Sequence, residues 1–220
     1  MNRGMSGRIY LGATLLIRAL FLGGVIVTAT QGNWETAIVS AVGLILSFLP
    51  QVIERTLRVN LPLLYEFIIV SFVMLSMFMG EIGHAYAAFW WWDVALHASS
   101  GVLLGYVGFL VLYILYKQKL LKTSATVIAF FTFAVGMASA GVWEIIEFSV
   151  DQIFGTYMQR GADDTMKDMI VAGLGSLLAA SAAYVHIKWP NKGLYYKWIE
   201  KFFDVNPRFK LIQKKRARRV

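Results

Sequence analysis

Six long apolar stretches constrain this sequence more than any other feature. They lie at approximately residues 9–29, 35–53, 61–80, 93–116, 123–150 and 166–187. A helix needs about 20 residues to cross ~30 Å of hydrocarbon, and inside lipid its backbone groups must bond within the helix. Hydrophobic residues form 58% of the 220-residue chain, more than a soluble domain covers with polar surface. The sequence therefore predicts an all-α, polytopic bundle of about six transmembrane helices, expected in a bacterial inner membrane.

The basic residues predict how this bundle is oriented. The N-terminal segment and the loops after the second and fourth spans share one side of the membrane, and they contain Arg3, Arg8, Arg55, Arg58, Lys117, Lys119 and Lys122. The loops on the opposite side contain only Arg160 and Lys167. Lys and Arg collect in cytoplasmic loops. Both termini are therefore predicted to be cytoplasmic.

A basic tail, residues 188–220, follows the predicted membrane domain of residues 1–187. The tail holds 11 of the 21 Lys and Arg residues, in a chain with a net charge of +8. Because it comes directly after the last span, attraction to anionic inner-leaflet headgroups explains its charge better than binding to nucleic acid does. Its segment GLYYKWIEKFF predicts an amphipathic helix lying on that leaflet, and the final KKRARRV predicts disorder.

Three further features are interpreted as structural. Arg18 lies inside the first span, so it is expected to pair with Glu66 or Glu54 on a neighbouring span, or to extend its head to the inner headgroups. His186 lies at the inner end of the last span, where it is expected to act as an interfacial anchor. Tyr86–Trp92, with five aromatic residues in seven, predicts an aromatic belt at the outer interface.

Nine of the thirteen acidic residues map at or near the predicted outer ends of the spans: Glu35, Glu81, Asp93, Glu144, Glu147, Asp151, Asp163, Asp164 and Asp168. Glu35 and Asp163 are expected to be ordinary helix-end residues, because polar and acidic side chains are favoured at helix N-termini. On spans four, five and six, the acids lie at the end of a stripe of small residues spaced three or four apart. Such stripes let membrane helices approach closely, so the three acidic ends are predicted to converge.

The converging residues suit a divalent metal ion. The segment Glu81–His84 has the Glu-x-x-His spacing found in di-metal helix bundles, and Glu144 and Glu147 lie one to two turns below the interface, where an unpaired charge is costly. Asp93 lies one turn from His97 and can orient its ring. We predict metal ligands at Glu81, His97, Glu144, Glu147, Asp164 and Asp168, and catalytic roles for Asp93 and His84. The ion would be Zn²⁺, Mn²⁺, Ca²⁺ or Mg²⁺.

Three ordered motifs in the second half of the chain are shared with a known family. They are D-x-x-x-H-x-x-S-G, W-E-x-x-E-F and D-D-T-x-x-D, in the segments WWDVALHASSGVLLG, GVWEIIEFSVDQIFGT and ADDTMKD. In combination they resemble the YjdF-type family of small bacterial integral membrane proteins, to which no activity is assigned. The resemblance covers roughly residues 61–183. It implies a membrane protein and points to Asp93, His97, Ser100, Gly101, Trp143, Glu144, Glu147, Asp163, Asp164 and Asp168.

Two classes of function remain open. The chain has no cysteine, which excludes thiolate chemistry, and it lacks a nucleotide-binding loop and a spaced Ser-His-Asp set. The first class is a metal-dependent membrane hydrolase, in which the ion activates water against a lipid or lipid-linked substrate. The alternative is an ion or small-solute transporter or channel that uses the same carboxylates as a cation or proton site. The acidic residues stop about halfway across the membrane, which favours the enzyme because transport needs a polar route to both faces.

Overall fold

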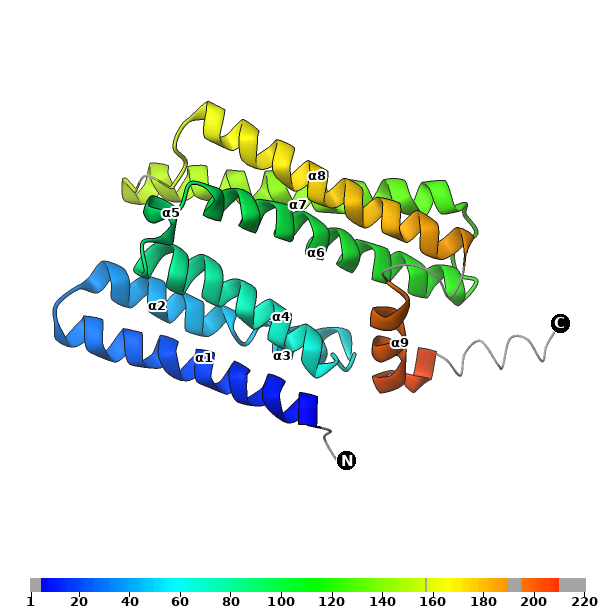
Figure 1. Cartoon of the computed structure of the whole chain (residues 1–220), viewed down its shortest axis with the longest axis horizontal. Helices are drawn as coiled ribbons and strands as arrows, with labels where there is room; N and C mark the ends of the chain where they lie inside the picture. The colour runs from blue at the N-terminus through cyan, green and yellow to red at the C-terminus, as the bar shows by residue number, and fades with distance from the viewer. Residues whose placement is uncertain (1–4, 157, 190–194, 210–220) are drawn as a thin grey trace. The chain divides into compact units, whose positions relative to one another are not determined.

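The structure is a computed structural model that describes residues 5–156, 158–189 and 195–209. Within these ranges all regular structure is helical. Six helical segments are long and apolar enough to cross a membrane: Met5–Thr30, Trp34–Leu57, Leu63–Ile82, Trp91–Lys117, Ala125–Phe154 and Ala162–Lys188. The predicted multi-pass helical bundle is therefore confirmed. The chain divides into two compact units, Met1–Trp92 and Asp93–Val220 (Figure 1).

The surfaces of the six segments are suited to lipid. Large apolar side chains are exposed on each of them, for example Leu16, Ile145 and Leu178, which are 61%, 65% and 67% exposed. A soluble monomer rarely exposes apolar patches of this extent. In a bilayer the same surface lies against acyl chains, so only the residues between the helices need protein partners.

The N-terminal unit begins with two antiparallel helices, of which the second is bent. α1 (Met5–Thr30) packs against α2 (Trp34–Leu46) after a tight turn. α3 (Leu49–Leu57) then completes the second span, with Pro50 in its first turn. Proline lacks the backbone N–H that a continuous helix would need at this point, which explains why the span is divided into α2 and α3.

The third span changes its helical geometry partway along. α4 (Leu63–Val73) continues without a break as the π-helix η1 (Met74–Ile82). Long π-helical stretches are rare. After η1, His84 has a positive φ of 54° and precedes the short helix α5 (Ala85–Ala88). The span therefore ends before His84 is reached.

A partly buried ion pair connects the first and third spans. A terminal nitrogen of Arg18 (Nη2) lies 3.2 Å from Glu66 Oε1 and also donates to Gln51 Oε1 at 3.0 Å and to the Ser47 carbonyl at 2.8 Å. Gln51 in turn donates to Glu66 at 2.6 Å. The predicted pairing of Arg18 with Glu66 is confirmed. Glu54, the other candidate, accepts a hydrogen bond from a backbone amide instead.

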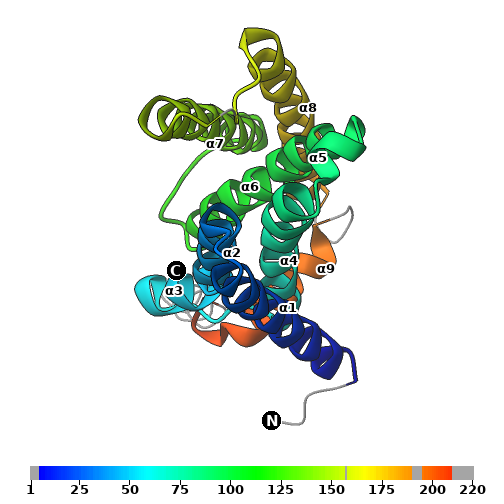
Figure 2. The same cartoon turned by 90° about the vertical axis from the view of Figure 1, so that its left-hand side faces the viewer.

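Three long helices form the C-terminal unit. α6 (Trp91–Lys117), α7 (Ala125–Phe154) and α8 (Ala162–Lys188) lie next to one another (Figures 1 and 2). Their close approach depends on small residues. A Cβ atom on Gly101 of α6 would overlap the backbone carbonyl of Ala172 on α8, and one on Gly136 of α7 would overlap the Ser176 hydroxyl of α8. The predicted convergence along small-residue stripes is therefore confirmed for these three helices.

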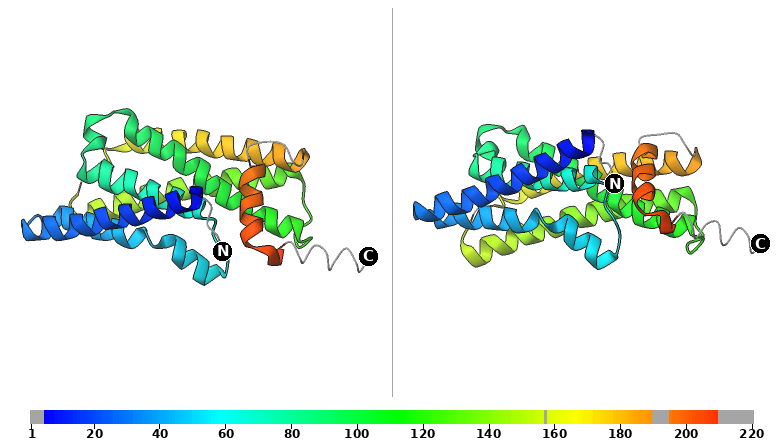
Figure 3. Two further views of the ribbon diagram at one scale, coloured as in Figure 1. Left: turned by 60° about the horizontal axis from the view of Figure 1, so that its bottom comes forward. Right: turned by 90° about the horizontal axis from the view of Figure 1, so that it is seen from below.

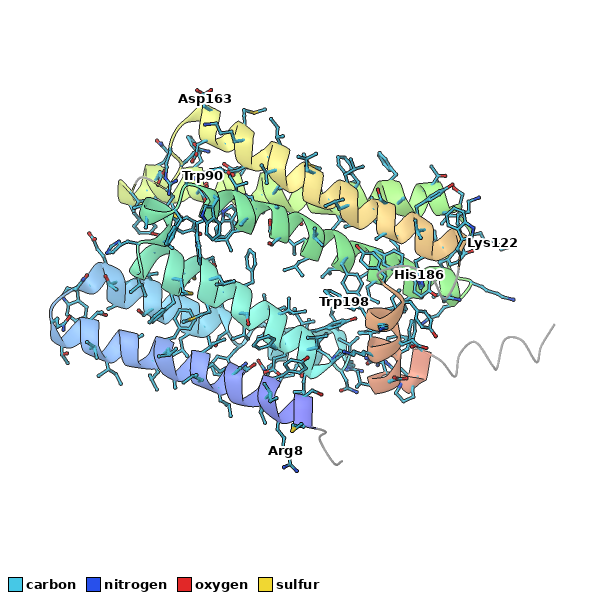
Figure 4. All side chains as sticks on the ribbon, in the orientation of Figure 1. Arg8, Trp90, Lys122, Asp163, His186 and Trp198 are labelled. Carbon is cyan, nitrogen blue, oxygen red and sulfur yellow. The ribbon has the colours of Figure 1, made fainter. Side chains whose placement is uncertain are left out.

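The two ends of this unit differ in chemistry (Figure 4). Asp163 lies at one end, which we name the acidic end, and Lys122, His186 and Trp198 lie at the other. α9 (Tyr196–Val205) crosses that second end (Figure 3). This polarity follows from the alternating directions of α6, α7 and α8, which bring the start of α6, the end of α7 and the start of α8 together.

α9 turns its apolar face to protein. Ile199, Phe202 and Phe203 are buried, and Phe203 contacts the Tyr113 ring of α6. The Tyr195 hydroxyl donates to the Ala179 carbonyl at 3.0 Å, and burial raises the pKa of this hydroxyl, so it stays neutral. The predicted helix is present in the tail, and its apolar face packs against the same chain; its contact with the inner leaflet stays a prediction. The KKRARRV end lies outside the described residues.

His186 is not an interfacial anchor, contrary to the prediction. Its side chain is buried, with only 4% of the residue exposed, and its ring packs edge-on against Phe109 and Tyr113 of α6. The sequence placed it correctly at the end of a span. Its burial follows from tertiary contacts with α6 that hydropathy does not report.

The orientation of the bundle is open to a direct test by cysteine labelling. The chain has no cysteine, so single variants at the exposed positions Gln31, Ala162 and Lys122 report one loop each. The positive-inside rule predicts that Gln31→Cys and Ala162→Cys react with an impermeant maleimide in intact cells. Lys122→Cys should react only after permeabilisation. The reverse pattern would contradict the orientation and place the acidic end in the cytoplasm.

Candidate metal centre

Three side chains at the acidic end converge on a small volume. Asp93 and His97 lie one turn apart on α6, and Asp168 lies on α8. His97 Nε2 is 3.5 Å from Asp93 Oδ1 and 3.8 Å from Asp168 Oδ2. One ligand atom from each of the three residues lies within 4.8 Å of the other two. We name these residues the triad.

The distances within the triad suit a shared ion better than direct hydrogen bonds. Both nitrogen–oxygen separations exceed the hydrogen-bonding range of about 2.7–3.2 Å. Ligands about 2.0–2.2 Å from a tetrahedral ion are themselves about 3.4 Å apart, close to the separations in the triad. His97 and Asp168 are 7% and 5% exposed, so water solvates them poorly. The arrangement can therefore hold one cation between an imidazole and two carboxylates.

Glu144 adds a third carboxylate, from α7, and like Asp168 it is buried. The residue is 6% exposed, and neither of its carboxylate oxygens has a hydrogen-bond partner among the described residues. A side chain on Gly141 would meet Met169 of α8 at 3.8 Å. Glu144 follows Gly141 by three residues and Asp168 precedes Met169 by one, so the two carboxylates share this end and interact electrostatically. A buried carboxylate without a donor is costly unless a cation compensates it.

Two other predicted ligands lie at the same end with different surroundings. Glu147 accepts a hydrogen bond from the Trp143 indole at 2.8 Å, and its charge interacts with those of Glu144, Asp93 and Asp168. Asp164 interacts electrostatically with Asp93 and Asp168. Both carboxylates therefore lie near the triad. As ligands they stay predictions, because the group of converging ligand atoms consists of the triad residues.

Glu81 and His84 belong to the N-terminal unit. Because the helix ends at Ile82 and His84 has a positive φ, the two residues do not occupy neighbouring positions on one helical face. The His84 amide instead donates to the Glu81 carbonyl at 3.3 Å. The Glu-x-x-His geometry that the spacing suggested is thus not formed. The metal role of Glu81 and the catalytic role of His84 stay predictions.

Sequence reasoning missed a loop that reaches the triad. Arg160, in the segment between α7 and α8, places Nη1 3.7 Å from Asp93 Oδ2. Asp151 organises this segment: its carboxylate accepts hydrogen bonds from the Thr156 hydroxyl and from the amides of Met158 and Gln159, at 2.7–2.9 Å. Asp151 was grouped with the converging acids, but its hydrogen bonds give it a structural role. The rarity of basic residues in the predicted outer loops was the one signal that pointed to Arg160.

Comparison with known proteins identifies the family. Residues 9–189 match the model of a family described as "Predicted membrane protein (DUF2238)". The chain belongs to this family. It is also 30% identical over 138 residues to an uncharacterised protein of Thermotoga maritima, a match that covers 62% of this chain and 70% of that protein. No solved structure matches the chain.

Membership of this family agrees with the helical membrane architecture but assigns no chemical activity. The matched residues run from the first span to the end of the last, so the whole bundle is the family's unit. Both the family and the six apolar helices show that the chain is a multi-pass membrane protein. The family description names no substrate, so the triad and Glu144 are the features of the chain that indicate a function.

Proposed function

We propose that the acidic end of the C-terminal unit binds a divalent metal ion through Asp93, His97, Asp168 and Glu144. The observation that carries the proposal is the combination of the triad with a buried Glu144 whose two oxygens have no described partner. The carboxylates of Asp93 and Glu144 both interact electrostatically with that of Asp168, and like charges repel strongly at low dielectric. A divalent cation removes that repulsion and supplies the partner that Glu144 needs.

The ligand set favours some ions over others. Imidazole nitrogen suits Zn²⁺ and other late transition metals, Mn²⁺ is a transition metal that carboxylates bind well, and Ca²⁺ and Mg²⁺ prefer oxygen ligands alone. His97 contributes a nitrogen directly between the carboxylates of Asp93 and Asp168. We therefore expect Zn²⁺ or Mn²⁺ to bind more tightly than Ca²⁺ or Mg²⁺.

The reaction that this site supports best is hydrolysis of a lipid or lipid-linked substrate. A bound divalent ion would supply a water of lowered pKa and a Lewis acid for the bond to be cleaved. The chain itself holds the ion at one end of the bundle, and the Asp93 side chain is 21% exposed there. A substrate can therefore approach the triad from the open side of Asp93.

An apolar groove supports a lipid over a water-soluble substrate. It lies between α6 and α8 and has a volume of about 360 Å³. Its lining is almost entirely apolar and comprises Val94, Ala98, Ser99, Val102, Val171, Leu174, Gly175 and Leu178. Val94 follows Asp93 directly, and Val171 lies three residues beyond Asp168. The groove therefore begins beside the triad and runs away from it, as an acyl chain attached to a reacting headgroup would require.

The packing below the triad argues against a transport path. On α6 the next interior residue is Gly101, whose backbone is in close contact with Ala172 and Ser176 of α8. Deeper still, Gly105 lies against Ala179. Among the described residues these contacts bring α6 and α8 together directly below the triad, and ions are poorly tolerated where the surrounding groups are apolar.

Metal retention by purified protein tests the proposal. Wild-type protein loaded with Mn²⁺ should retain it after desalting and should melt at a higher temperature, because the ion binds only the folded state. His97→Ala, Asp168→Asn and Glu144→Gln should each weaken Mn²⁺ binding by about a hundredfold or more. Asp163→Asn is the matched control, since it removes an exposed carboxylate from the same end of α8.

Two results would overturn the proposal. Equal Mn²⁺ retention in Asp163→Asn and in all three ligand variants would show that these residues do not bind the ion. Flux of Mn²⁺ across liposomes that disappears in Glu144→Gln would instead assign the carboxylates to transport.

A further inference from the structure

Arg160 lies beside the triad in a loop whose backbone is held by hydrogen bonds. Asp151, in the last turn of α7, accepts three hydrogen bonds from Thr156, Met158 and Gln159. Gly155 and Gly161, with φ of 66° and 103°, mark the two ends of the segment. The hydrogen bonds to Asp151 fix the backbone immediately before Arg160. The side chain of Arg160 therefore extends from a backbone whose path is set by the fold.

Arg160 lies beside the triad and is partly exposed. Its side chain is 43% exposed, twice as much as the 21% of its partner Asp93. The 3.7 Å separation from Asp93 Oδ2 is longer than a charge-assisted hydrogen bond. An ion held by the triad would draw the Asp93 carboxylate toward itself. Arg160 would then present its planar, multi-donor guanidinium to whatever occupies the open side of the ion.

We propose that the site takes a phosphate-bearing amphiphile, whose phosphate group is bound jointly by Arg160 and the ion at the triad. This inference depends on the proposed metal function and specifies its substrate class. Phosphate has several unesterified oxygens, so one can contact the ion while two others accept paired hydrogen bonds from a guanidinium. A neutral ester or amide offers no such pair of anionic oxygens. The apolar groove beside the triad accounts for the hydrophobic part of the ligand.

A relaxation experiment with Mn²⁺-loaded protein tests this inference directly. Mn²⁺ accelerates the relaxation of a phosphorus nucleus only when the two are close. The probes are dioctanoyl phosphatidic acid, inorganic phosphate, and dioctanoylglycerol as a phosphate-free competitor. Retained Mn²⁺ is measured first in every variant, so the metal site and phosphate recognition are scored separately.

The variants separate recognition by Arg160 from general charge effects. Arg160→Gln should weaken binding of dioctanoyl phosphatidic acid by about tenfold to a hundredfold, the value of a charged hydrogen-bond pair. Mn²⁺ should be retained at least as well as in wild type, because the substitution removes a positive charge from beside Asp93. Arg160→Lys should recover only part of the loss, because lysine cannot bind phosphate through a planar pair of donors. Lys167→Gln is the matched control, since Lys167 is the other basic residue of the predicted outer loops and is exposed on α8.

The three probes also distinguish a lipid phosphate from free phosphate as the ligand. Tighter binding of dioctanoyl phosphatidic acid than of inorganic phosphate, with dioctanoylglycerol competing weakly, is the result expected for a lipid. Equal binding of the two phosphates would support recognition by Arg160 but assign it to a soluble ligand. Mn²⁺ retention with equal phosphorus relaxation in wild type and Arg160→Gln would overturn the inference and leave the metal function standing. Failure of the wild type to retain Mn²⁺ would overturn both.

Discussion

Replacing Gly101 by valine should destabilise the C-terminal unit by about 3 kcal/mol or more, at the upper end of what overpacking costs. A Cβ atom at this position would overlap the Ala172 carbonyl oxygen. It would also lie 3.0 Å from the Ser176 amide nitrogen, closer than ordinary van der Waals contact. Both obstacles are backbone atoms, so no change of rotamer relieves the overlap. α6 and α8 would have to separate along the stripe where they now touch.

The same substitution should weaken the metal centre. His97 lies one turn before Gly101 on α6, and its partner Asp168 lies one turn before Ala172 on α8. Separation of the helices at Gly101 therefore lengthens the distance between His97 and Asp168, now 3.8 Å. Mn²⁺ retention should fall in Gly101→Val, although the substitution changes no predicted ligand.

Gly141→Ala provides the control for this prediction. Gly141 lies inside α7, and a Cβ atom there would meet only the terminal methyl group of Met169, at 3.8 Å. Alanine is favoured over glycine inside a helix by roughly 0.5–1 kcal/mol, so this variant should be slightly more stable than wild type. Thermal unfolding in detergent, followed by circular dichroism, measures both. Similar melting temperatures for Gly101→Val and Gly141→Ala would show that the helices do not approach as closely as the structure indicates.

Glu66→Leu should lower the free energy of unfolding by about 3 kcal/mol, the lower end of the range for buried ion pairs because this pair is partly exposed, since Arg18 would be left without a compensating charge. Arg18 and Glu66 side chains are each only 14% exposed. Arg18 would keep its contacts with the Gln51 side chain, the Ser47 carbonyl and the Phe48 ring, but all of these are neutral. Inside a membrane the positive charge would then draw in water or distort the N-terminal unit.

A double variant distinguishes loss of the pair from loss of a side chain. Arg18→Met combined with Glu66→Leu removes both charges and should recover most of the stability, since a buried ion pair is often replaceable by apolar residues of similar volume. Glu35→Gln, at an exposed position on α2, should change the stability little. If the double variant loses as much as the two single variants added together, the two charges are not energetically coupled, and the pairing seen here would not stabilise the fold.

The candidate site was predictable from sequence only where it depends on helical periodicity. The one-turn spacing of Asp93 and His97 and the stripe from Asp164 and Asp168 to Ala172 are properties of single helices, so the convergence of α6 and α8 followed from them. Which further carboxylate is buried beside the triad was not predictable. That depends on how far each helix slides past its neighbour, and it distinguishes the buried Glu144 from Glu147, which bonds to Trp143.

The environments of several residues were known only from the tertiary structure, because local sequence does not determine which distant residues they contact. His186 and the apolar face of α9 had the composition of membrane-surface residues, yet both are buried by α6. The Glu-x-x-His spacing assumed a regular helix that ends instead at Ile82. Arg160 reaches Asp93 from 67 positions away in sequence, through a loop whose path is set by hydrogen bonds to Asp151.

The sequence by itself determined that the chain is a membrane protein with six helical spans, and it predicted an acidic partner for Arg18, with Glu66 and Glu54 both as candidates. Both follow from hydropathy, because a polar or charged group in lipid must be bonded internally or paired whatever the detailed packing. Only the tertiary structure decided which acids meet, which lie against an imidazole, and which histidine is covered. Those outcomes depend on helix register and loop geometry, where shifts of one turn replace one set of neighbours by another.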